Sequence, residues 1–390
     1  MILTGEVFDG EKFIGTKSIV IEENKIKEIR DQEEESKGII LPGLIDAHIH
    51  FFGVKEDNLI SWNLTPEGLS VARSFKDMIN LLASGFTAVR DLGSKSAIFL
   101  SKAEKEGYIP GPRIIASGYS IAETGGNDDP TDLPLDMAQR LSYSFYCDSP
   151  WECRKAVRLA MRQGAEVIKI YSSGAFSQRG YPKPALTVED IKAIVDEAHR
   201  SGLKVASHAY GEEAIANSIE GGVDSIEHGL GLTEELAEEI KRKGIFYVPT
   251  LATYSKEIKI RELDEEVAVK RKELIDKHLN EDVKIAVEKG LKIVAGTDYV
   301  GSPERRHGDN YKEIVLLSRF MSLDKALASA TSIAADCLGL KMGRIAEGYE
   351  ANLVMFRKIR NADDLNPENV VYVVRKGKLY DPQNLKAIFS

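Results

Sequence analysis

Strand-like and helical segments alternate regularly over most of this chain, and this rhythm constrains the fold more than any other feature. Eight apolar, β-branched segments read as strands: residues 44–50, 87–92, 113–118, 166–171, 204–209, 224–229, 246–251 and 293–298. Helical stretches lie between them, at 74–84, 151–163, 188–201, 212–220 and 234–243, and glycine often follows such a stretch, as it does after a helix C-terminus. Eight βα units in series predict an α/β protein with a parallel (β/α)₈ TIM barrel over residues 43–344.

Two connections between these predicted units are unusually long. Residues 119–150, after the third strand, are rich in Gly, Asp and Pro and read as a loop. Residues 252–291, after the seventh strand, read as charged helices. Both leave the carboxyl end of a strand, which is the end where barrels place their active sites, so we expect both to border the site.

The two ends of the chain carry a different pattern, made of short strands without helical spacing. Residues 18–22 and 25–30 are β-rich, and Asn24 between them fits a tight hairpin turn. Strand patterns return after residue 345, at 352–356, 370–375 and 378–380. We therefore predict a small β-sandwich domain built from residues 1–42 and 345–390, which together flank the barrel.

Polar side chains end several of the apolar strands in the predicted barrel. His48 and His50 are two residues apart on the first strand, so their side chains point to one face. His208 ends the fifth predicted strand, His228 the sixth and Asp298 the eighth. Buried histidines can be satisfied by backbone carbonyls, but such residues are costly in a barrel interior unless they are paired or bind a metal. Imidazoles and a carboxylate predict a divalent metal site.

Lys169 lies in the middle of the fourth predicted strand, between two isoleucines. An ammonium group cannot ligate a cation, and burial beside metal ions would drive the lysine to lose its charge. A neutral lysine can add carbon dioxide to form a carbamate, whose two oxygens can bridge two metal ions. The alternative from the residues alone is a lysine paired with Asp or Glu near the site.

With these motifs in order, the chain resembles the amidohydrolase superfamily, the metal-dependent hydrolases of the urease and dihydroorotase type. The resemblance covers essentially the whole chain. It rests on the segment that enters the barrel, on three strand-end motifs and on the return to the terminal domain: residues 41–50, 207–211, 225–229, 295–298 and 343–354. Within the superfamily, residues 167–171 followed by Ser173-Gly174 are similar to the branch of imidazolonepropionase-related amidohydrolases and Xaa-Pro or Xaa-Arg dipeptidases.

The resemblance implies a site with two divalent ions, expected to be zinc. The buried ion would be held by His48, His50 and Asp298, the exposed ion by His208 and His228, and a carbamate on Lys169 would bridge the two. A hydroxide between two such ions is a nucleophile at neutral pH. We therefore expect cleavage of a peptide-like amide, in a dipeptide such as Xaa-Pro or Xaa-Arg or in an N-acyl amino acid.

Several further residues are candidates for catalysis or substrate binding. Asp298 would move the proton from the hydroxide to the leaving amine, and Tyr210, two residues after His208, could donate to the oxyanion. His307 follows the eighth strand and is a candidate to touch substrate or orient Asp298. Asn127 stands where the branch often has histidine, in a loop expected to line the pocket. The candidates for a substrate carboxylate are Arg179, Arg305 and Arg306.

Two other functions compete with this interpretation. A mononuclear enzyme could act on a cyclic amide, such as an imidazolone or hydantoin; deamination is disfavoured because Gly211 stands where superfamily deaminases carry glutamate. A non-catalytic scaffold is the third reading, but scaffolds of this superfamily have usually lost ligands, and every expected ligand is present here. A count of bound metal ions per chain separates the three.

Composition and charge limit the partners. The net charge of −9 argues against nucleic acid or an anionic membrane, so a small-molecule substrate is expected. Three cysteines, an odd number, argue against a disulfide scaffold. The sequence shows no signal peptide and no membrane-length apolar run, so we expect a cytoplasmic protein, and a homo-oligomer is compatible with the sequence.

Overall fold

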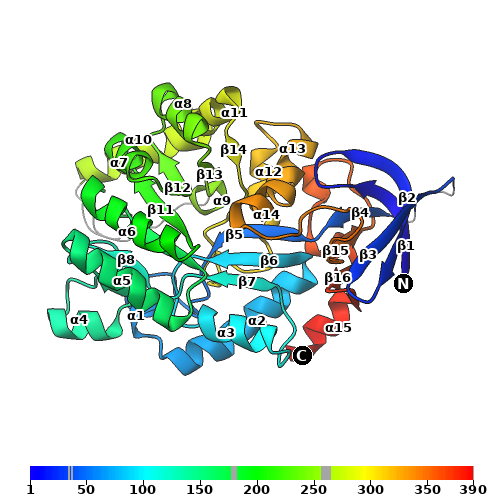
Figure 1. Cartoon of the computed structure of the whole chain (residues 1–390), viewed down its shortest axis with the longest axis horizontal. Helices are drawn as coiled ribbons and strands as arrows, with labels where there is room; N and C mark the ends of the chain where they lie inside the picture. The colour runs from blue at the N-terminus through cyan, green and yellow to red at the C-terminus, as the bar shows by residue number, and fades with distance from the viewer. Residues whose placement is uncertain (34–35, 37, 177–181, 256–264, 390) are drawn as a thin grey trace.

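The computed structural model describes residues 1–33, 36, 38–176, 182–255 and 265–389. It is an α/β protein with two sheets of parallel strands and a third, mixed sheet (Figure 1). In the figure, the blue strands of the N-terminus and the orange and red strands of the C-terminus lie together on one side of the molecule. The green helices α5 to α8 lie on the opposite side.

The larger parallel sheet has seven strands and the smaller has three. The larger one runs in the order β14 (Lys292–Ile293), β13 (Phe246–Val248), β12 (Ser225–Leu230), β11 (Lys204–Tyr210), β10 (Val167–Tyr171), β8 (Ser120–Ala122) and β9 (Ser144–Tyr146). The smaller one contains β5 (Leu44–Ile49), β6 (Phe86–Asp91) and β7 (Arg113–Ala116). All these strands pair in parallel, as the alternating strands and helices of the sequence predict.

Backbone hydrogen bonds join the two parallel sheets at two places. Ala47 N donates to Ala295 O (2.9 Å), and His50 N donates to Tyr299 O (2.8 Å), so β5 lies beside the segment that follows β14. At the second place, Glu166 N donates to Ala116 O (2.9 Å), which connects the start of β10, an interior strand of the larger sheet, to β7. The carboxyl end of β5 therefore lies beside the segment around residue 298, where Asp298 N donates to His48 O (2.8 Å).

The prediction that residues 119–150 form a loop was wrong. This segment contains β8, α4 (Leu135–Leu141) and β9, and β8 takes the place beside β10. The strands β8 and β9 have three residues each, and the Gly, Asp and Pro residues of the surrounding segment are typical of loops. The sequence pattern therefore did not show them. Cys147 at the end of β9 also forms a disulfide with Cys153 in α5, which the count of three cysteines did not reveal.

Two predicted strands are shorter in the structure than in the sequence pattern. β13 ends at Val248, because Pro249 has no N–H to continue the ladder. β14 ends at Ile293, and the chain from 294 to 298 instead bonds to several neighbours: Val294 N donates to Tyr247 O and Ala295 N to Ser329 O. The β-branched pattern therefore placed these strands correctly but overestimated their length.

Helices connect and cover the parallel strands. They are α1 (Leu59–Leu64), α2 (Glu67–Ala83), α3 (Ala97–Lys105), α5 (Pro150–Gln163), α6 (Val188–Arg200), α7 (Glu212–Gly221), α8 (Glu234–Lys243), α9 (Leu251–Tyr254), α10 (Glu265–Lys277), α11 (Val283–Lys289), α12 (Tyr311–Leu317), α13 (Leu323–Ser329) and α14 (Ser332–Leu338). Among the described helices, none combines the length and the apolar character needed to cross a bilayer.

Both ends of the chain contribute strands to the mixed sheet. Its order is β17 (Lys378–Tyr380), β16 (Val370–Arg375), β15 (Leu353–Phe356), β4 (Ile39–Pro42), β1 (Ile2–Phe8), β2 (Phe13–Glu22) and β3 (Lys25–Asp31). The β2–β3 hairpin closes with Glu22 opposite Lys25, around Asn24. β4 and β15 pair antiparallel and bring the two ends together, and the short helix α15 (Pro382–Lys386) follows.

Candidate active site

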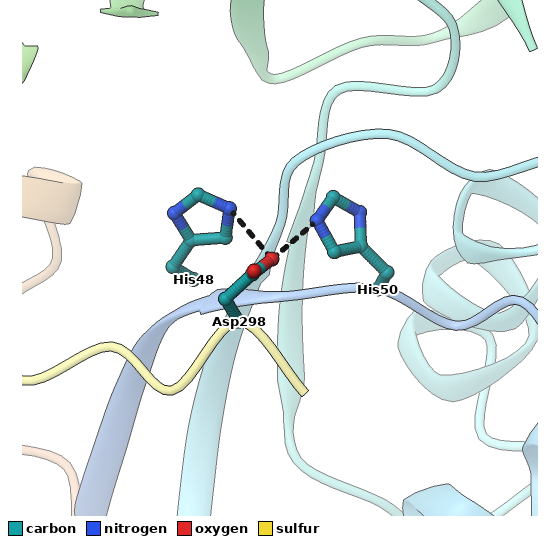
Figure 2. A group of neighbouring side chains, drawn as sticks. All are labelled: His48, His50 and Asp298. Carbon is teal, nitrogen blue, oxygen red and sulfur yellow. Dashed lines mark hydrogen bonds and ion pairs between the residues drawn. The ribbon is translucent and has the colours of Figure 1, made fainter. Parts of the chain in front are cut away.

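Three of the predicted ligands form a tight cluster at the carboxyl end of β5. Figure 2 shows the rings of His48 and His50 on either side of the Asp298 carboxylate. Asp298 Oδ1 lies 3.0 Å from His50 Nε2 and 3.4 Å from His48 Nε2. One ligand atom from each residue lies within 4.8 Å of the others. The period of two in β5 places both imidazoles on one face, and the chain from β14 returns to bring Asp298 between them.

The other ring nitrogen of each histidine is held by an acceptor. His48 Nδ1 donates to Glu227 (2.8 Å), and His50 Nδ1 donates to the carbonyl of Gly93 (2.8 Å). Since a neutral imidazole carries one N–H, these bonds leave a lone pair on each Nε2, facing the Asp298 carboxylate. Among the described residues, His48 Nε2 is buried without a hydrogen-bond partner. Three lone pairs that converge in a buried space fit a divalent cation.

A buried ionic network fixes the position of His48. Glu227 accepts from His48 on one oxygen and from Arg90 (2.7 Å) on the other. Arg90 also donates to the carbonyl of Ala47 (2.6 Å) and to Ser225 (3.0 Å). Burial lowers the pKa of His48, and the nearby charge of Lys169 lowers it further, so the imidazole is neutral. A carboxylate behind a histidine makes the ring a better metal ligand and fixes its tautomer.

Asp46 ties β5 to the segment that carries Asp298. Its carboxylate accepts from Thr297 Oγ1 (2.7 Å), from Asn310 Nδ2 (2.7 Å) and from the backbone N–H of His48 (3.1 Å). Burial raises the pKa of Asp46 to about 6, although these hydrogen bonds oppose the shift. Residues that are 251 positions apart in the chain are thus held in register at the site.

His208 and His228 lie beside this cluster, at the ends of β11 and β12. Their ring centroids are 4.6 Å apart, and the ring of His228 lies 5.0 Å from that of His48. His228 Nδ1 contacts Thr250 Oγ1 (2.7 Å), and His208 Nε2 donates to the carbonyl of Gly174 (3.1 Å). Burial, together with the charge of Lys169, lowers the pKa of His208 to about 3. Both rings are therefore neutral and available as nitrogen ligands.

Lys169 is buried on β10, and its charge acts on the same histidines. Its side chain is 1% exposed, and Nζ lies 5.0 Å from the centroid of the Tyr171 ring. Within the described part of the chain, Nζ forms no ion pair, so the alternative of a lysine paired with Asp or Glu is not observed. Burial lowers the pKa of Lys169 to about 8, although nearby Glu227, Asp298 and Asp128 oppose the shift. The amine is thus easier to neutralise than an exposed lysine.

Left-handed backbone conformations concentrate at the site. His228 (φ 67°), Thr250 (φ 52°) and Asp298 (φ 57°) all adopt a positive φ, which costs a residue with a β-carbon about 1 kcal/mol or more. Asp128, whose charge reaches Lys169, has φ 67°. Such strain persists only where surrounding contacts impose it, and it is typical of functional sites.

Tyr210 lies where the sequence predicted, next to the histidines. Its ring centroid is 4.3 Å from that of His208 and 5.2 Å from that of His228. Its hydroxyl shares a 2.6 Å hydrogen bond with the hydroxyl of Tyr254, a residue that sequence reasoning missed. Burial raises the pKa of Tyr210, although the bond to Tyr254 opposes the shift, so the phenol keeps its proton at neutral pH.

Two further candidates, His307 and Arg305, contact different parts of the cluster. His307 is buried and donates to the carbonyl of His50 (3.1 Å), so it supports the backbone of a candidate ligand. Arg305, rather than His307, contacts Asp298: it donates to the carbonyl (2.9 Å) and to Oδ2 (3.3 Å). Arg305 also forms a two-pronged ion pair with Asp57 (2.6 and 2.7 Å). Orientation of Asp298 therefore falls to Arg305.

Of the other three candidates, two lie in the described part of the chain and one does not. Asn127 is buried, and its side-chain amide donates to Asp128 (3.1 Å). Arg306 pairs with Asp309 and is largely exposed, which makes it a poor candidate for a substrate carboxylate. Arg179 lies outside the described residues.

Sequence reasoning missed Glu227 and Arg90, although a signal for both exists. Arg90 lies in the apolar strand β6 as Lys169 lies in β10, and Glu227 directly precedes a predicted ligand. A charge inside an apolar strand needs a partner, and two such charges of opposite sign are a candidate pair. Their pairing with His48 depends on the tertiary fold.

The fold and the converging lone pairs define an α/β protein with a candidate metal centre at the ends of parallel strands. The model of the amidohydrolase family matches residues 39–380, and the chain belongs to this family. It is therefore a hydrolase that acts on carbon–nitrogen bonds.

Individual relatives are similar to the chain along most of its length. Ochratoxinase from Aspergillus niger is 31% identical over 371 residues, covering 88% of this chain and 75% of that protein. The crystal structure of A. niger ochratoxinase has a TM-score of 0.89 at 26% identity, covering 97% of this chain and 95% of that chain. A Xaa-Pro dipeptidase with methionine bound in its active site has a TM-score of 0.85 at 31% identity, covering 97% and 99%. A prolidase complexed with N-methylphosphonate-L-proline has a TM-score of 0.88 at 29% identity, with the same coverage.

The network behind His48 yields a first prediction. Glu227→Gln is expected to weaken metal binding about 10- to 100-fold, because a neutral amide makes the imidazole less basic and leaves the buried charge of Arg90 without its counter-ion. Metal affinity would be measured by competition with a chromophoric chelator. Glu239→Gln, which changes an exposed carboxylate paired with Arg242, serves as the control. Unchanged affinity in a folded Glu227→Gln protein would show that this network does not support a ligand.

Proposed function

We propose that this chain is a binuclear metal-dependent amidohydrolase that cleaves a peptide-like amide bond in a dipeptide or an N-acyl amino acid. The observation that carries the proposal is the convergence of four imidazoles and one carboxylate around a buried lysine. Such a donor set suits divalent zinc, which accepts nitrogen and oxygen ligands. Of these residues, His48, His50 and Asp298 would hold one ion, and His208 and His228 the other.

Lys169 would join the two halves of the site as a carbamate. Its neutral amine attacks carbon dioxide, a nitrogen–carbon bond forms, and the nitrogen releases one proton to solvent. The burial of Lys169 and its lack of an ion pair within the described residues support this step, because they favour the uncharged amine. The product replaces a buried cation with an anion suited to lie between two cations.

The bound ions would supply a water nucleophile at neutral pH and polarise the carbonyl of the substrate. The protein supplies the proton transfers. Burial opposes ionisation of Asp298, but its contact with His50 and the nearby positive charge of Arg305 lower its pKa, so the carboxylate is ionised. Asp298 would take a proton from the attacking water and give it to the amide nitrogen as the C–N bond breaks. Tyr210, with its proton retained, would donate to the oxygen of the developing tetrahedral carbon.

The proposed architecture behind this site is a (β/α)₈ barrel over residues 43–344, with a β-sandwich domain formed by residues 1–42 and 345–390. The hydrogen bonds that join the two parallel sheets at two places support closure of the barrel. The mixed sheet shared by the two chain ends supports the division into domains.

The relatives support the substrate class. One is described as a Xaa-Pro dipeptidase and another as a prolidase with a phosphonate derivative of proline bound. In both descriptions the substrate or ligand includes an amino acid, which is the chemistry we propose for this chain.

Metal content and hydrolysis, measured together, test the proposal. Protein purified without chelator should contain about two ions per chain and should hydrolyse a subset of a dipeptide and N-acyl amino acid library. A strong chelator should abolish turnover, and added zinc should restore it. About one ion per chain with turnover of a cyclic amide would favour the mononuclear alternative, and no metal and no turnover would favour a scaffold.

A further inference from the structure

Thr250 orients His228, one of the candidate metal ligands. Its hydroxyl lies 2.7 Å from His228 Nδ1, and an Nδ1–H that donates to this hydroxyl leaves the Nε2 lone pair free for a metal ion. Thr250 has φ 52°, a left-handed conformation that is costly for a β-branched residue and that persists only where surrounding contacts impose it. The orientation of His228 therefore depends on the groups that hold this turn of the chain in place.

Glu313 on α12 holds the chain directly after Thr250. Its side chain is buried, and its two carboxylate oxygens accept from the backbone N–H groups of Leu251 (3.0 Å) and Ala252 (2.7 Å). Both N–H groups belong to the first turn of α9, where backbone N–H groups have no partner within the helix. Glu313 therefore fixes the direction in which the chain leaves Thr250.

A buried histidine–aspartate pair holds the other side of this turn. His278 and Asp282 are the two ends of η1 (His278–Asp282), a π-helical turn between α10 and α11, and both side chains are fully buried. His278 Nε2 donates to the carbonyl of Pro249 (2.7 Å), and His278 Nδ1 lies 3.3 Å from Asp282 Oδ2. The same Asp282 oxygen accepts from the backbone N–H of Gly231 (2.7 Å), directly after β12. The pair thus ties the turn before α9 to the end of β12.

Glu313, His278 and Asp282 together hold the backbone on both sides of Thr250, and we call these three residues the Thr250 clamp. Burial of a carboxylate or an imidazole costs free energy unless hydrogen bonds offset it. Here those hydrogen bonds go to the backbone beside Thr250 and after β12, and the proposed chemistry uses none of the three side chains. A need to impose a strained backbone beside His228 explains why these polar groups are buried at this place.

We propose that the Thr250 clamp positions a ligand of the second metal ion: it imposes the conformation in which the Thr250 hydroxyl orients His228. This inference rests on the proposed binuclear site and specifies which residues set the affinity for the ion at His208 and His228. The ion at His48 has different support, because the carboxylate of Glu227 orients His48 directly. A carboxylate makes an imidazole more basic than a hydroxyl does, so the ion at His228 should be the more weakly bound.

Zinc titration of the full-length protein tests the clamp without relying on turnover. Glu313→Gln should weaken zinc binding at the His228 position about 10- to 100-fold, because an amide accepts on one oxygen only and turns an N–H toward one of the two backbone N–H groups. Affinity at the His48 position should not change. Competition with a chromophoric chelator measures both affinities, and Glu227→Gln identifies the His48 position by weakening it selectively. Glu288→Gln, which changes an exposed carboxylate on α11, is the matched control.

Substitutions of Thr250 show whether the clamp acts through this residue. Thr250→Val removes the hydroxyl with little change of shape, so it should cause the same selective loss of affinity, and Thr250→Ser should keep most of the affinity. His278→Gln, whose amide can still donate to the carbonyl of Pro249, should retain more affinity than His278→Leu. Addition of Glu313→Gln to Thr250→Val should cause little further loss, because the hydroxyl that the clamp positions is already absent.

The outcomes separate this inference from the proposed function. If the wild-type protein binds fewer than about two zinc ions per chain, the binuclear site itself fails. If it binds two and folded Glu313→Gln keeps the wild-type affinity at the His228 position, the clamp is wrong and the hydrolase stands. Equal weakening at both positions, or a full additional loss in the Thr250→Val background, would also overturn the clamp. If Glu313→Gln does not fold, unchanged zinc affinity in Thr250→Val contradicts the inference by itself.

Discussion

Lys169→Ala is expected to abolish most activity and most metal binding. The substitution removes the group that would join the two halves of the site, so kcat/KM should fall by at least about 10³-fold and the metal content should drop below that of the wild type. Metal analysis and steady-state kinetics on the same preparations would show both effects. Labelled carbon dioxide should also give a carbamate signal in the wild-type protein that the variant lacks.

The control for this substitution is a lysine outside the site. Lys192→Ala removes an exposed lysine that pairs with Glu220, and it should leave metal content and turnover unchanged. Thermal unfolding would show whether Lys169→Ala is folded; removal of a buried amine without an ion pair within the described residues should not destabilise the fold strongly. Full metal content and activity in Lys169→Ala would rule out a binuclear site that depends on this lysine.

Asp298→Asn is expected to lower kcat about 10²- to 10⁴-fold while the fold is retained. An asparagine can still accept hydrogen bonds from Arg305, but it cannot take a proton from the attacking water or return one to the leaving amine. The substitution also removes a charged candidate ligand, so metal binding should weaken. Steady-state kinetics at saturating metal would separate the two effects, because added zinc can restore occupancy but not the missing base.

The comparison variant here is Asp309→Asn, which changes an exposed carboxylate paired with Arg306. Its kcat and metal content should equal those of the wild type. If Asp298→Asn at full metal occupancy had the wild-type kcat, proton transfer would have to be assigned to another group. In that case Asp298 would remain a candidate ligand only.

Much of the fold could be predicted because it follows from local pattern. The strands β5, β6, β10, β11 and β12 were located to within one or two residues, since runs of β-branched residues between helical stretches have few other interpretations. The strands β8 and β9 could not be predicted, because three residues are too few to show a period. β8 pairs with β10, and β9 pairs with β8. These neighbours come together only in the folded protein.

The residues of the candidate site also fall into those that the sequence predicted and those that it did not. His48, His50, His208, His228 and Asp298 were visible because each lies at or near the end of a segment predicted as an apolar strand, and parallel strands bring their carboxyl ends together. Glu227 was not assigned, because its bond to His48 spans 179 residues. The contact of Tyr254 with Tyr210 was also not predicted, since Tyr254 lies in a helix of the connection after β13 and meets Tyr210 only in the folded protein.

The sequence by itself determined the class of protein and the side chains that converge at the strand ends. It could do so because side-chain alternation in a strand and the parallel direction of successive strands are local consequences of chain geometry. The tertiary structure alone decided which nitrogen of His48 and His50 faces Asp298, and that Arg305 rather than His307 orients this carboxylate. Those choices depend on hydrogen bonds between residues far apart in the chain, and only the packed fold brings such partners within reach.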